Sequence, residues 1–373
     1  MKFKLNKAEH LSKFQLVNKI GKLKITTHEN KSLSNDSLVF YCDDNKLYLY
    51  VTNTVSSSLV FLCDYQDEFD NFAVDCSSFT NAFTNFPSDE VQFVYIKEDN
   101  QLIFGNKKTR VSLKTSLAED INDVIKQDLS INENIQFQNV DFENFTDSIK
   151  YTTFSCSSDI DEYPYSSIMF FIENDLFHSQ SSDKHRISIY GNQYENQSSY
   201  LISKHQAELI QSYITKDYNY KYSIYKNKFI IKWNENILVT SLENNSHQSV
   251  YSSFSKFFND SIFIAKVVLE KEDILKSLKF NSNISGSHLF NIKSNNNELV
   301  ISSSSVDKGA VADKINIDQT INKLDVSYLI SHFIKCLEVI NSKTVEINFY
   351  NYNDFTLCIV NDNNFTHLLF PME

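Results

Sequence analysis

A repeated order of strands and helices is the feature that most constrains how this chain can fold. The hydrophobic period predicts a strand, a helix, a run of short strands, a second helix and further strands, and this order then recurs twice. The first helices are expected to begin near Lys7, Asp141 and Glu270, and the second helices near Cys76, Ser203 and Asp325. The repeat length of about 120 to 135 residues is that of a domain.

The repeat also predicts the fold class. Each copy contains two helices and about eight short strands, which is typical of an α+β fold with helices packed on one side of antiparallel sheets. Polar stretches at 130–134 and 257–261 separate the copies. We therefore expect three domains, spanning residues 1–130, 131–258 and 259–373.

The charge of the chain is unevenly distributed. The formal net charge of −12 argues against general attraction to nucleic acid. Seven lysines nevertheless lie in the first 24 residues, opposed only by Glu9. This segment could meet phosphate while the acidic remainder repels it, or it could be a solvated lysine-rich start, which charge alone favours.

Composition predicts a cytoplasmic protein. Each apolar run is shorter than the ~20 residues that cross a bilayer, and the first residues lack the apolar centre of a signal peptide. Six scattered cysteines fit reduced thiols rather than a disulfide framework. We expect no membrane association.

The motifs of common enzymes are missing from the sequence. The five glycines lie far apart, so neither GxxxxGK[ST] nor GxGxxG can be formed, and there is no HExxH, CxxC or GxSxG. We therefore expect a protein that is not an enzyme and that has no catalytic residues, no cofactor and no metal.

Two weak candidates for chemistry remain. His332 and Cys336 are four residues apart on a predicted helix and could share a metal, but further ligands are missing, so packing is preferred. Ser182, Asp183 and His185 contain the side chains of a hydrolytic triad. Such close neighbours alternate in direction and cannot align a nucleophile with its base, so a hydrolase remains a remote hypothesis.

The chain ends in an apolar run, Leu368 to Phe370, followed by Pro371 and Met372. Terminal residues are usually polar and frayed. Taken alone, Leu368 and Phe370 are best interpreted as part of an ordinary edge strand.

Three segments in order, "MKFKLNKAEHLSK", "SSDKHRISIYGN" and "HLLFPM", together with the length and the three-domain plan, resemble the bacterial-type sliding clamp, the β subunit of DNA polymerase III. The resemblance covers the whole chain. It implies a head-to-tail homodimer whose six domains form a ring around duplex DNA, with helices inside and sheets outside. It also implies a processivity factor that holds the replicative polymerase, the clamp loader and other motif-bearing proteins.

The resemblance carries over to particular positions. Residues expected in the partner-peptide groove are Tyr165, Ser182, His185, Arg186, Ile187, Phe254, Leu368, Phe370, Pro371 and Met372. Lysines expected to face DNA are Lys13, Lys19, Lys22, Lys24, Lys150, Lys204, Lys276 and Lys279. Residues expected at the dimer interface are Val111 and Leu113 on one subunit and Leu275, Leu278 and Ile284 on the other.

Departures from the family pattern leave an alternative open. Lys184 stands where the family has glycine, Ser249 and Ser253 stand where it has proline and arginine, and Glu373 replaces a basic residue. We expect a groove with altered motif preference. The alternative hypothesis is a divergent scaffold that binds peptides but does not close a ring around DNA.

Overall fold

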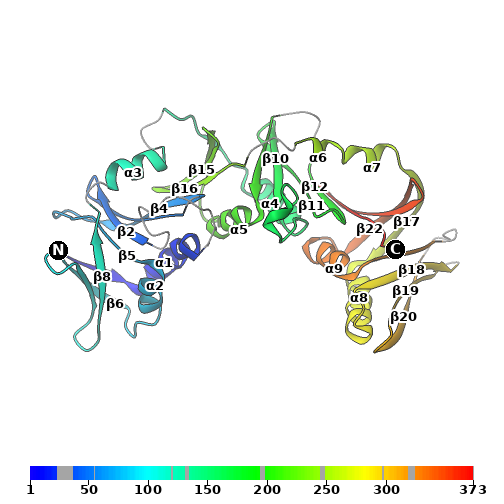
Figure 1. The fold of residues 1–373 in the computed structure, drawn as a ribbon, viewed down its shortest axis with the longest axis horizontal. Coiled ribbons are helices and arrows are strands. Elements are labelled where there is room, and N and C mark those ends of the chain that lie inside the picture. The colour runs from blue at the N-terminus through cyan, green and yellow to red at the C-terminus, as the bar shows by residue number, and fades with distance from the viewer. Residues whose placement is uncertain are drawn as a thin grey trace. The chain divides into compact units, whose positions relative to one another are not determined.

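The computed structural model describes residues 1–22, 37–53, 55–118, 121–130, 134–193, 198–243, 248–295, 298–317 and 324–372. These residues form two compact units, shown in Figure 1. Unit 1 comprises Met1–Phe142 with Glu208–Leu242, and unit 2 comprises Glu143–Ala207 with Glu243–Glu373.

One order of elements occurs three times along the described chain: strand, helix, four strands, helix, three strands. This confirms the repeat predicted from the sequence. The first copy is β1 (Lys2–Asn6), α1 (Lys7–Lys22), β2 (Ser37–Asp43), β3 (Lys46–Thr52), β4 (Ser56–Asp64), β5 (Phe72–Asp75), α2 (Cys76–Thr84), β6 (Glu90–Ile96), β7 (Gln101–Gly105) and β8 (Arg110–Leu117).

The second copy is β9 (Gln138–Asn139), α4 (Phe142–Thr153), β10 (Ser167–Glu173), β11 (Leu176–Ser182), β12 (Arg186–Tyr190), β13 (Ser199–Ser203), α5 (Lys204–Tyr213), β14 (Lys221–Tyr225), β15 (Lys228–Trp233) and β16 (Asn236–Ser241). The third copy is β17 (Ile262–Glu270), α8 (Lys271–Ser285), β18 (Leu289–Asn295), β19 (Glu298–Ser305), β20 (Gly309–Asn316), β21 (Asp325–Leu329), α9 (Ile330–Val339), β22 (Thr344–Tyr352), β23 (Phe355–Asp362) and β24 (Phe365–Leu369). Between the copies lie α3 (Ile121–Asp128), α6 (Gln248–Ser252) and α7 (Ser255–Asn259), and the short helix η1 (Ile160–Glu162) follows α4.

The second helix of the third copy begins later than predicted. The sequence predicts a helix from Asp325, whereas Asp325–Leu329 is strand β21 and α9 begins at Ile330. Val326 and Tyr328 are buried and alternate with more exposed neighbours, which is the period of a strand with one covered face. The same apolar residues also fit a helical period, so the pattern alone is ambiguous.

Asparagine and aspartate make the tight hairpin turns. Asp44 and Asn45 join β2 to β3 with φ of 47° and 58°, and Asn353 and Asp354 join β22 to β23 with φ of 47° and 70°. A two-residue turn of this kind requires positive φ at both positions, and Asn and Asp tolerate it better than other residues with a side chain. The hairpins therefore form in a chain with only five glycines.

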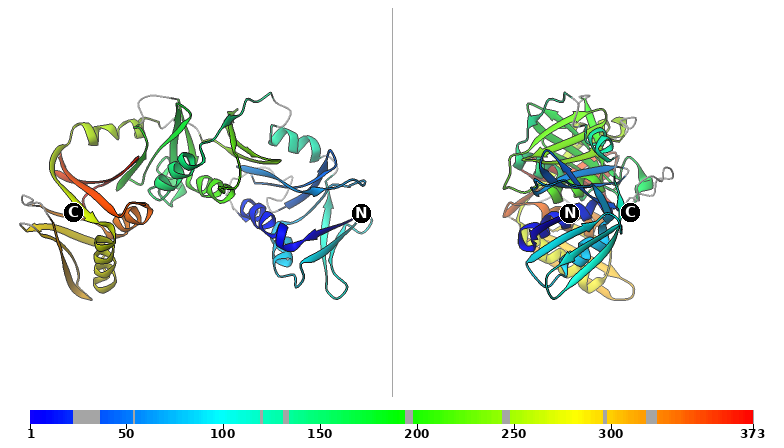
Figure 2. Two further views of the ribbon diagram at one scale, coloured as in Figure 1. Left: turned by 180° about the vertical axis from the view of Figure 1, so that it is seen from behind. Right: turned by 90° about the vertical axis from the view of Figure 1, so that its left-hand side faces the viewer.

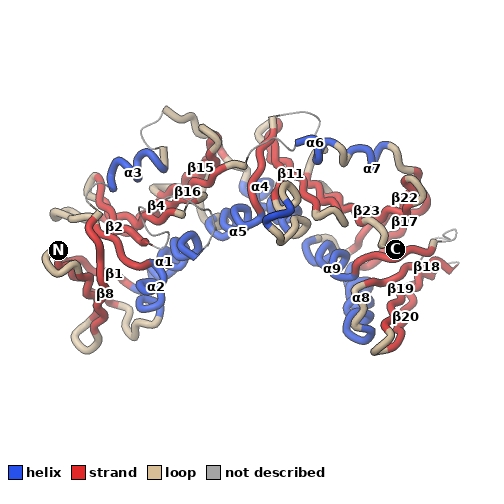
Figure 3. Tube along the Cα trace, viewed as in Figure 1, coloured by secondary structure: helices blue, strands red, loops and turns tan. Residues whose placement is uncertain are grey.

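Unit 1 is built on a twelve-stranded sheet with the order β1-β6-β7-β8-β5-β2-β3-β4-β16-β15-β14-β9. Helices α1 and α2 lie next to each other on this unit (Figure 3). Phe79 of α2 packs against Phe93 of β6 and Phe104 of β7, with ring centroids 6.3 and 5.4 Å apart. These rings are fully buried, so the helix pair is attached to the sheet by an aromatic core.

Unit 2 contains an eight-stranded sheet, β13-β10-β11-β12-β24-β23-β22-β17, and a four-stranded sheet, β20-β19-β18-β21. Helix α8 packs against β19 and β20 and lies beside α9 (Figure 2). The buried Ser303 of β19 donates its hydroxyl to Ser285 Oγ of α8 at 2.9 Å and to the carbonyl of Asn281 at 3.2 Å. This helix is thus attached partly through hydrogen bonds.

The same kind of join links the repeats within each unit. Strand β4 of the first copy pairs antiparallel with β16 of the second, and β12 of the second pairs antiparallel with β24 of the third. In the earlier copy, each join uses the strand that comes directly before β5, or before β13, which is the equivalent of β5 in the second copy. In the following copy, each join uses the last strand. Neighbouring copies share a sheet, so the division into two compact units does not test the three domain boundaries expected from the sequence. Those boundaries stay a prediction.

In the part of the chain that the structure describes, no helix is long and apolar enough to cross a membrane.

Candidate functional site

Two segments that are far apart in the sequence meet at the end of unit 2. Strands β12 and β24 are paired, with Ile187 opposite Leu368 and Arg186 opposite Leu369. The ladder continues beyond β24, because the Phe370 amide donates to the carbonyl of His185 at 3.1 Å. The Met372 amide then donates to the carbonyl of Ser327 at 2.9 Å, which fixes the terminal segment on a second side.

The turn before β12 is held by its own polar side chains. The Ser182 hydroxyl donates to the carbonyl of Arg186 at 2.8 Å, and the Lys184 amide donates to Ser182 Oγ at 3.1 Å. Lys184 has a φ of 76°, the left-handed region that favours glycine. Glycine adopts this backbone conformation without strain, which explains why the family named in the sequence analysis has glycine at this position. The Lys184 side chain instead pairs with Glu162 at 2.9 Å and lies 5.2 Å from the centroid of the Tyr165 ring.

Arg186 supports this turn from inside the protein. Its side chain is only 4% exposed and its Nε donates to Asp183 Oδ2 at 2.8 Å. Burial lowers the pKa of the Arg186 guanidinium, and the Asp183 carboxylate opposes that effect. His332 of α9 lies 3.8 Å from the same carboxylate, and burial together with Arg186 lowers its pKa to about 4. Arg186 therefore positions the turn from inside the protein rather than offering a surface.

Aromatic side chains form an accessible surface beside the terminal segment. The Phe257 ring of α7 lies 4.9 Å from the ring of Phe370 and 5.1 Å from that of Tyr352, centroid to centroid. All three are half-buried and pack on a core that includes Tyr251, Phe254 and Leu368. We call Phe257, Tyr352 and Phe370 the C-terminal apolar surface. Half-buried aromatic rings over a rigid core can desolvate the apolar side chains of a short peptide.

The structure divides the predicted groove residues into two groups. Five of them are buried beneath the surface: Ser182, Arg186, Ile187, Phe254 and Leu368. Five are exposed or half-buried: Tyr165, His185, Phe370, Pro371 and Met372. The sequence analysis missed Phe257 and Tyr352, although Phe257 follows the predicted Phe254 by only three residues.

Neither weak candidate for chemistry gains the contacts that it needs. The Ser182 hydroxyl donates to a backbone carbonyl and the Asp183 carboxylate accepts from Arg186, so these two do not align with His185 as a triad. Cys336 is fully buried, and burial raises the pKa of its thiol. Among the described residues, no group of three or more His, Cys, Asp or Glu side chains could hold a metal ion.

The lysines expected to face DNA differ in how they are engaged. Lys13, Lys150 and Lys204 donate to oxygens at 3.0 to 3.2 Å within their own units, and Lys279 of α8 pairs with Glu338 of α9 at 2.8 Å. Burial also lowers the pKa of Lys13. Lys19 on α1 and Lys276 on α8 are exposed. The side chain of Lys22 and all of Lys24 lie outside the described residues.

Among the described residues, β8 and β20 each keep an open edge, as do the strands β1, β9, β13, β17 and β21 at the other sheet ends. Strand β8 pairs with β7 through Arg110–Lys114 but with β5 only through Thr115–Leu117, so half of its second edge is open. Strand β20 pairs only with β19. Val111 and Leu113 are half-buried on β8, as are Val311 and Ile315 on β20, a strand that the sequence analysis missed.

The other predicted interface residues lie on α8. Leu275 and Leu278 are buried in the core of unit 2 at 9% and 0% exposed. One copy of the chain therefore already covers them, and their contact with a second copy stays a prediction. Ile284 is 49% exposed near the end of the helix.

Antiparallel sheets backed by helices, repeated three times and joined edge to edge, define the class of DNA-clamp folds. Structures of the DNA polymerase sliding clamp from Bacillus subtilis and of the DNA polymerase III beta subunit from Thermotoga maritima resemble the chain with TM-scores of 0.83 and 0.79, at 14% and 16% identity. A sliding clamp from Pseudomonas aeruginosa bound to griselimycin matches with a TM-score of 0.81 at 13% identity. Each match covers 100% of this chain and 99% of the other.

Within the class, the chain thus has the fold of the bacterial DNA polymerase III beta subunit, the sliding clamp. No family model matches the sequence, and no curated protein matches it significantly.

Proposed function

We propose that this protein is a DNA polymerase processivity factor, a sliding clamp in which two copies close head to tail around duplex DNA. It acts as a tether in the cytoplasm and catalyses no reaction of its own. The observation that carries the proposal is the pair of open edges: β4 joins β16 and β12 joins β24, which leaves β20 and β8 as the two strands of a third join. A second copy supplies the missing partner for each.

The composition of the two edges supports this closure. Val111 and Leu113 of β8 alternate with exposed residues, as do Val311 and Ile315 of β20. Antiparallel pairing of β8 with β20 would cover these half-buried side chains and satisfy the free backbone groups of both strands. An exposed edge in a lone subunit would otherwise favour uncontrolled association. Ile284, exposed on α8, would gain cover from the same closure.

The helices provide the surface proposed for DNA. Lys19 of α1 and Lys276 of α8 are exposed. Scattered cations on polar helices attract the phosphate backbone without reading bases, so the duplex is held loosely and can slide. Lys13, Lys150, Lys204 and Lys279, which have protein partners, would contribute less.

The C-terminal apolar surface is the proposed site for partner motifs of the replicative polymerase, the clamp loader and other clamp-binding proteins. The P. aeruginosa clamp with the same fold is bound to griselimycin, which supports ligand binding as a property of such clamps. Phe257, Tyr352 and Phe370 would cover apolar side chains of a motif. The ion pair of Lys184 with Glu162 changes the rim beside Tyr165, so motif preference should differ from that of clamps with glycine there.

The decisive experiment has two parts. Light scattering at several concentrations is expected to give twice the 43.3 kDa of one chain. Protein loaded on circular DNA should then be retained, and cutting the circle should release it. A persistent monomer, or equal retention on circular and linear DNA, would instead support the alternative scaffold that binds peptides without encircling DNA.

Partner binding is tested separately with two variants. Phe257→Ala combined with Phe370→Ala should abolish capture of a polymerase-derived peptide while the dimer persists. Phe280→Ala removes an exposed aromatic ring from α8 and serves as the matched control. Loss of the dimer in the double variant would mean that these aromatic residues are structural.

A further inference from the structure

The end of the unit 1 sheet opposite its helices is hollowed. Residues of β1, β6, β7 and β8 line a hollow of about 700 Å³ on this face. Lys4, Gln92, Gly105 and Arg110 stand in register across the four strands. Gly105 leaves the middle of this row without a side chain, and a Cβ there would lie 2.2 Å from the carbonyl oxygen of Thr109. The β7–β8 turn therefore requires the glycine that keeps the hollow open.

Four cations surround the hollow without a carboxylate partner. The side chains of all four are exposed: Lys2, Lys4, Lys107 and Arg110. Among the described residues, no Asp or Glu oxygen is close enough to their charged nitrogens to form an ion pair. Glu90 is the single acidic residue of the lining. Some lysines elsewhere on this acidic chain are paired, as in Lys46–Glu235, Lys97–Asp70, Lys266–Glu346, Lys293–Asp325 and Lys314–Glu298. The hollow thus gathers four cations beside a single acidic residue, on a chain whose net charge is −12.

The floor of the hollow is apolar. Val94 and Ile103 are paired across β6 and β7 and are half-buried on the same face as the cations. Four strands spaced about 4.8 Å apart give a width of roughly 14 Å, which four or five residues of an extended chain would cross. The site thus offers an apolar contact at its centre and positive charge around it.

We propose that this hollow binds an acidic peptide segment of a partner protein. Its carboxylates meet Lys2, Lys4, Lys107 and Arg110, and one apolar side chain rests on Val94 and Ile103. An apolar floor of side-chain size favours a peptide over a nucleic-acid duplex, whose outer surface offers phosphates and no apolar group to place there. Complementary charge gives such an encounter both speed and selectivity. The inference does not depend on ring closure, because unit 1 alone carries the hollow.

Fluorescence anisotropy with a fluorescein-labelled Glu-Glu-Leu-Glu-Glu peptide tests the proposal on the full chain. The peptide should bind at low salt, and rising salt should weaken the binding. Lys4→Glu with Arg110→Glu should reduce the affinity by about tenfold or more, because two attractions become repulsions. Lys4→Arg with Arg110→Lys should retain the affinity.

Controls separate the hollow from other causes. Lys308→Glu with Lys343→Glu makes the same change in net charge at exposed positions elsewhere and should leave binding unchanged. Phe257→Ala with Phe370→Ala should also leave it unchanged. Equal loss in either control, or no binding to the unaltered protein, would overturn the proposal. A labelled DNA duplex is the competing ligand. The proposal would also be overturned if the duplex bound more tightly than the peptide and if the Lys4→Glu and Arg110→Glu changes abolished that binding.

Discussion

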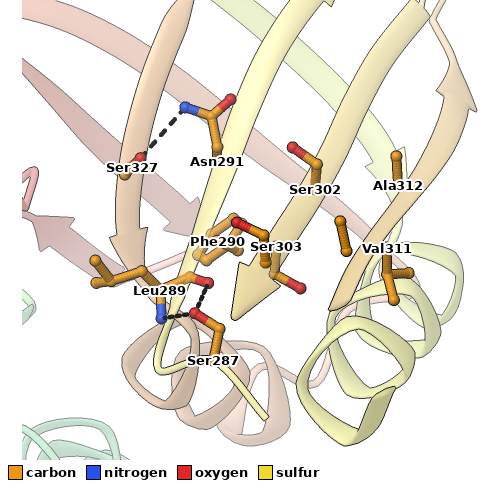
Figure 4. Close-up of a pocket in the computed structure, with 11 residues that line it drawn as sticks. Ser287, Leu289, Phe290, Asn291, Ser302, Ser303, Val311, Ala312 and Ser327 are labelled. Carbon is orange, nitrogen blue, oxygen red and sulfur yellow. Dashed lines mark hydrogen bonds between the residues drawn. The ribbon is translucent and has the colours of Figure 1, made fainter. Parts of the chain in front are cut away.

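Two four-stranded regions of the molecule share a plan and differ on both of their faces. The β1-β6-β7-β8 end of the unit 1 sheet and the β21-β18-β19-β20 sheet of unit 2 each have helices on one face and finish in an open edge strand. Figure 4 shows the hollow on the second sheet, of about 540 Å³, where Asn291, Ser302, Ala312 and Ser327 stand on neighbouring strands. Its lining is small and uncharged, whereas the first hollow is rimmed by cations.

The second lining contains no Lys or Arg, and carboxylates also neutralise lysines elsewhere on that sheet. Lys293 and Lys314 of the second sheet pair with Asp325 and Glu298 of adjacent strands, at 3.1 and 2.8 Å. The first sheet has no such partners for its cations among the described residues. One fold can therefore present a neutral surface or a positive one, depending on the residues that line it and on the acidic residues beside its lysines. The difference also shows that counting lysines in a sequence does not locate positive surface.

The largest expected effect is on the free energy of unfolding, when the contacts between a helix and its sheet are removed. Phe79→Ala removes a ring that touches both sheet strands of the aromatic core and should lower the free energy of unfolding by about 3 to 5 kcal/mol. Ser303→Ala removes hydroxyl bonds from the second sheet and should cost only about 1 to 2 kcal/mol. Urea unfolding of both variants measures the contrast. Equal losses would mean that the two helix faces are not attached differently.

Acid should affect unit 2 more than unit 1. His332 is half-buried, and its folded pKa is about 4, whereas the unfolded chain takes up its proton near 6.5. Its stabilising contribution is complete above pH 6.5 and falls by about 3 kcal/mol as the pH approaches 4. The only tryptophan, Trp233, lies in unit 1, so circular dichroism should change at a higher pH than tryptophan fluorescence. His332→Gln should narrow that gap, and an unchanged gap would contradict this assignment.

The two open edges are expected to respond alike. Val111→Lys on β8 or Val311→Lys on β20 places a charge where closure would bury it, at a cost of roughly 2 kcal/mol per join. Each variant should shift the light-scattering mass from twice 43.3 kDa toward 43.3 kDa. Combining Val111→Lys with Val311→Glu should restore the larger mass. Sensitivity of one edge only would argue that β8 and β20 are not partners.

The smallest effect tests the charge comparison directly. The double variant Asp325→Asn, Glu298→Gln removes the carboxylate partners of Lys293 and Lys314. The second sheet should then bind the acidic peptide weakly, with an affinity within about tenfold of the detection limit. Because these pairs are exposed, the free energy of unfolding should change by less than about 1 kcal/mol. Anisotropy in the Lys4→Glu, Arg110→Glu background isolates the gain. No gain there would mean that unpaired lysines alone do not make a site.

Much of the fold could be predicted from the sequence, and the exceptions share a cause. The periodicity predicted α1, α2, α4, α5 and α8 within a few residues. Strand β20 was missed because "GAVADKIN" lacks the bulky alternation of a strand, and its neighbours β19 and α8 meet it only in the folded protein. The resemblance led us to expect the "SDKHRI" and terminal segments in one groove, but it did not predict that they pair as strands. The sequence could not predict which lysines form ion pairs. Lys279, for example, meets Glu338 on another helix only after folding.

The repeated join between copies gives the molecule a direction. At β4 with β16 and at β12 with β24, an earlier copy always contributes the second strand before its second helix, and the later copy contributes its last strand. Each chain therefore has unlike ends, and a ring closed by the same rule runs the same way round at every boundary. Its two flat faces cannot then be equivalent. A partner bound to such a ring would be oriented with respect to the path of the DNA.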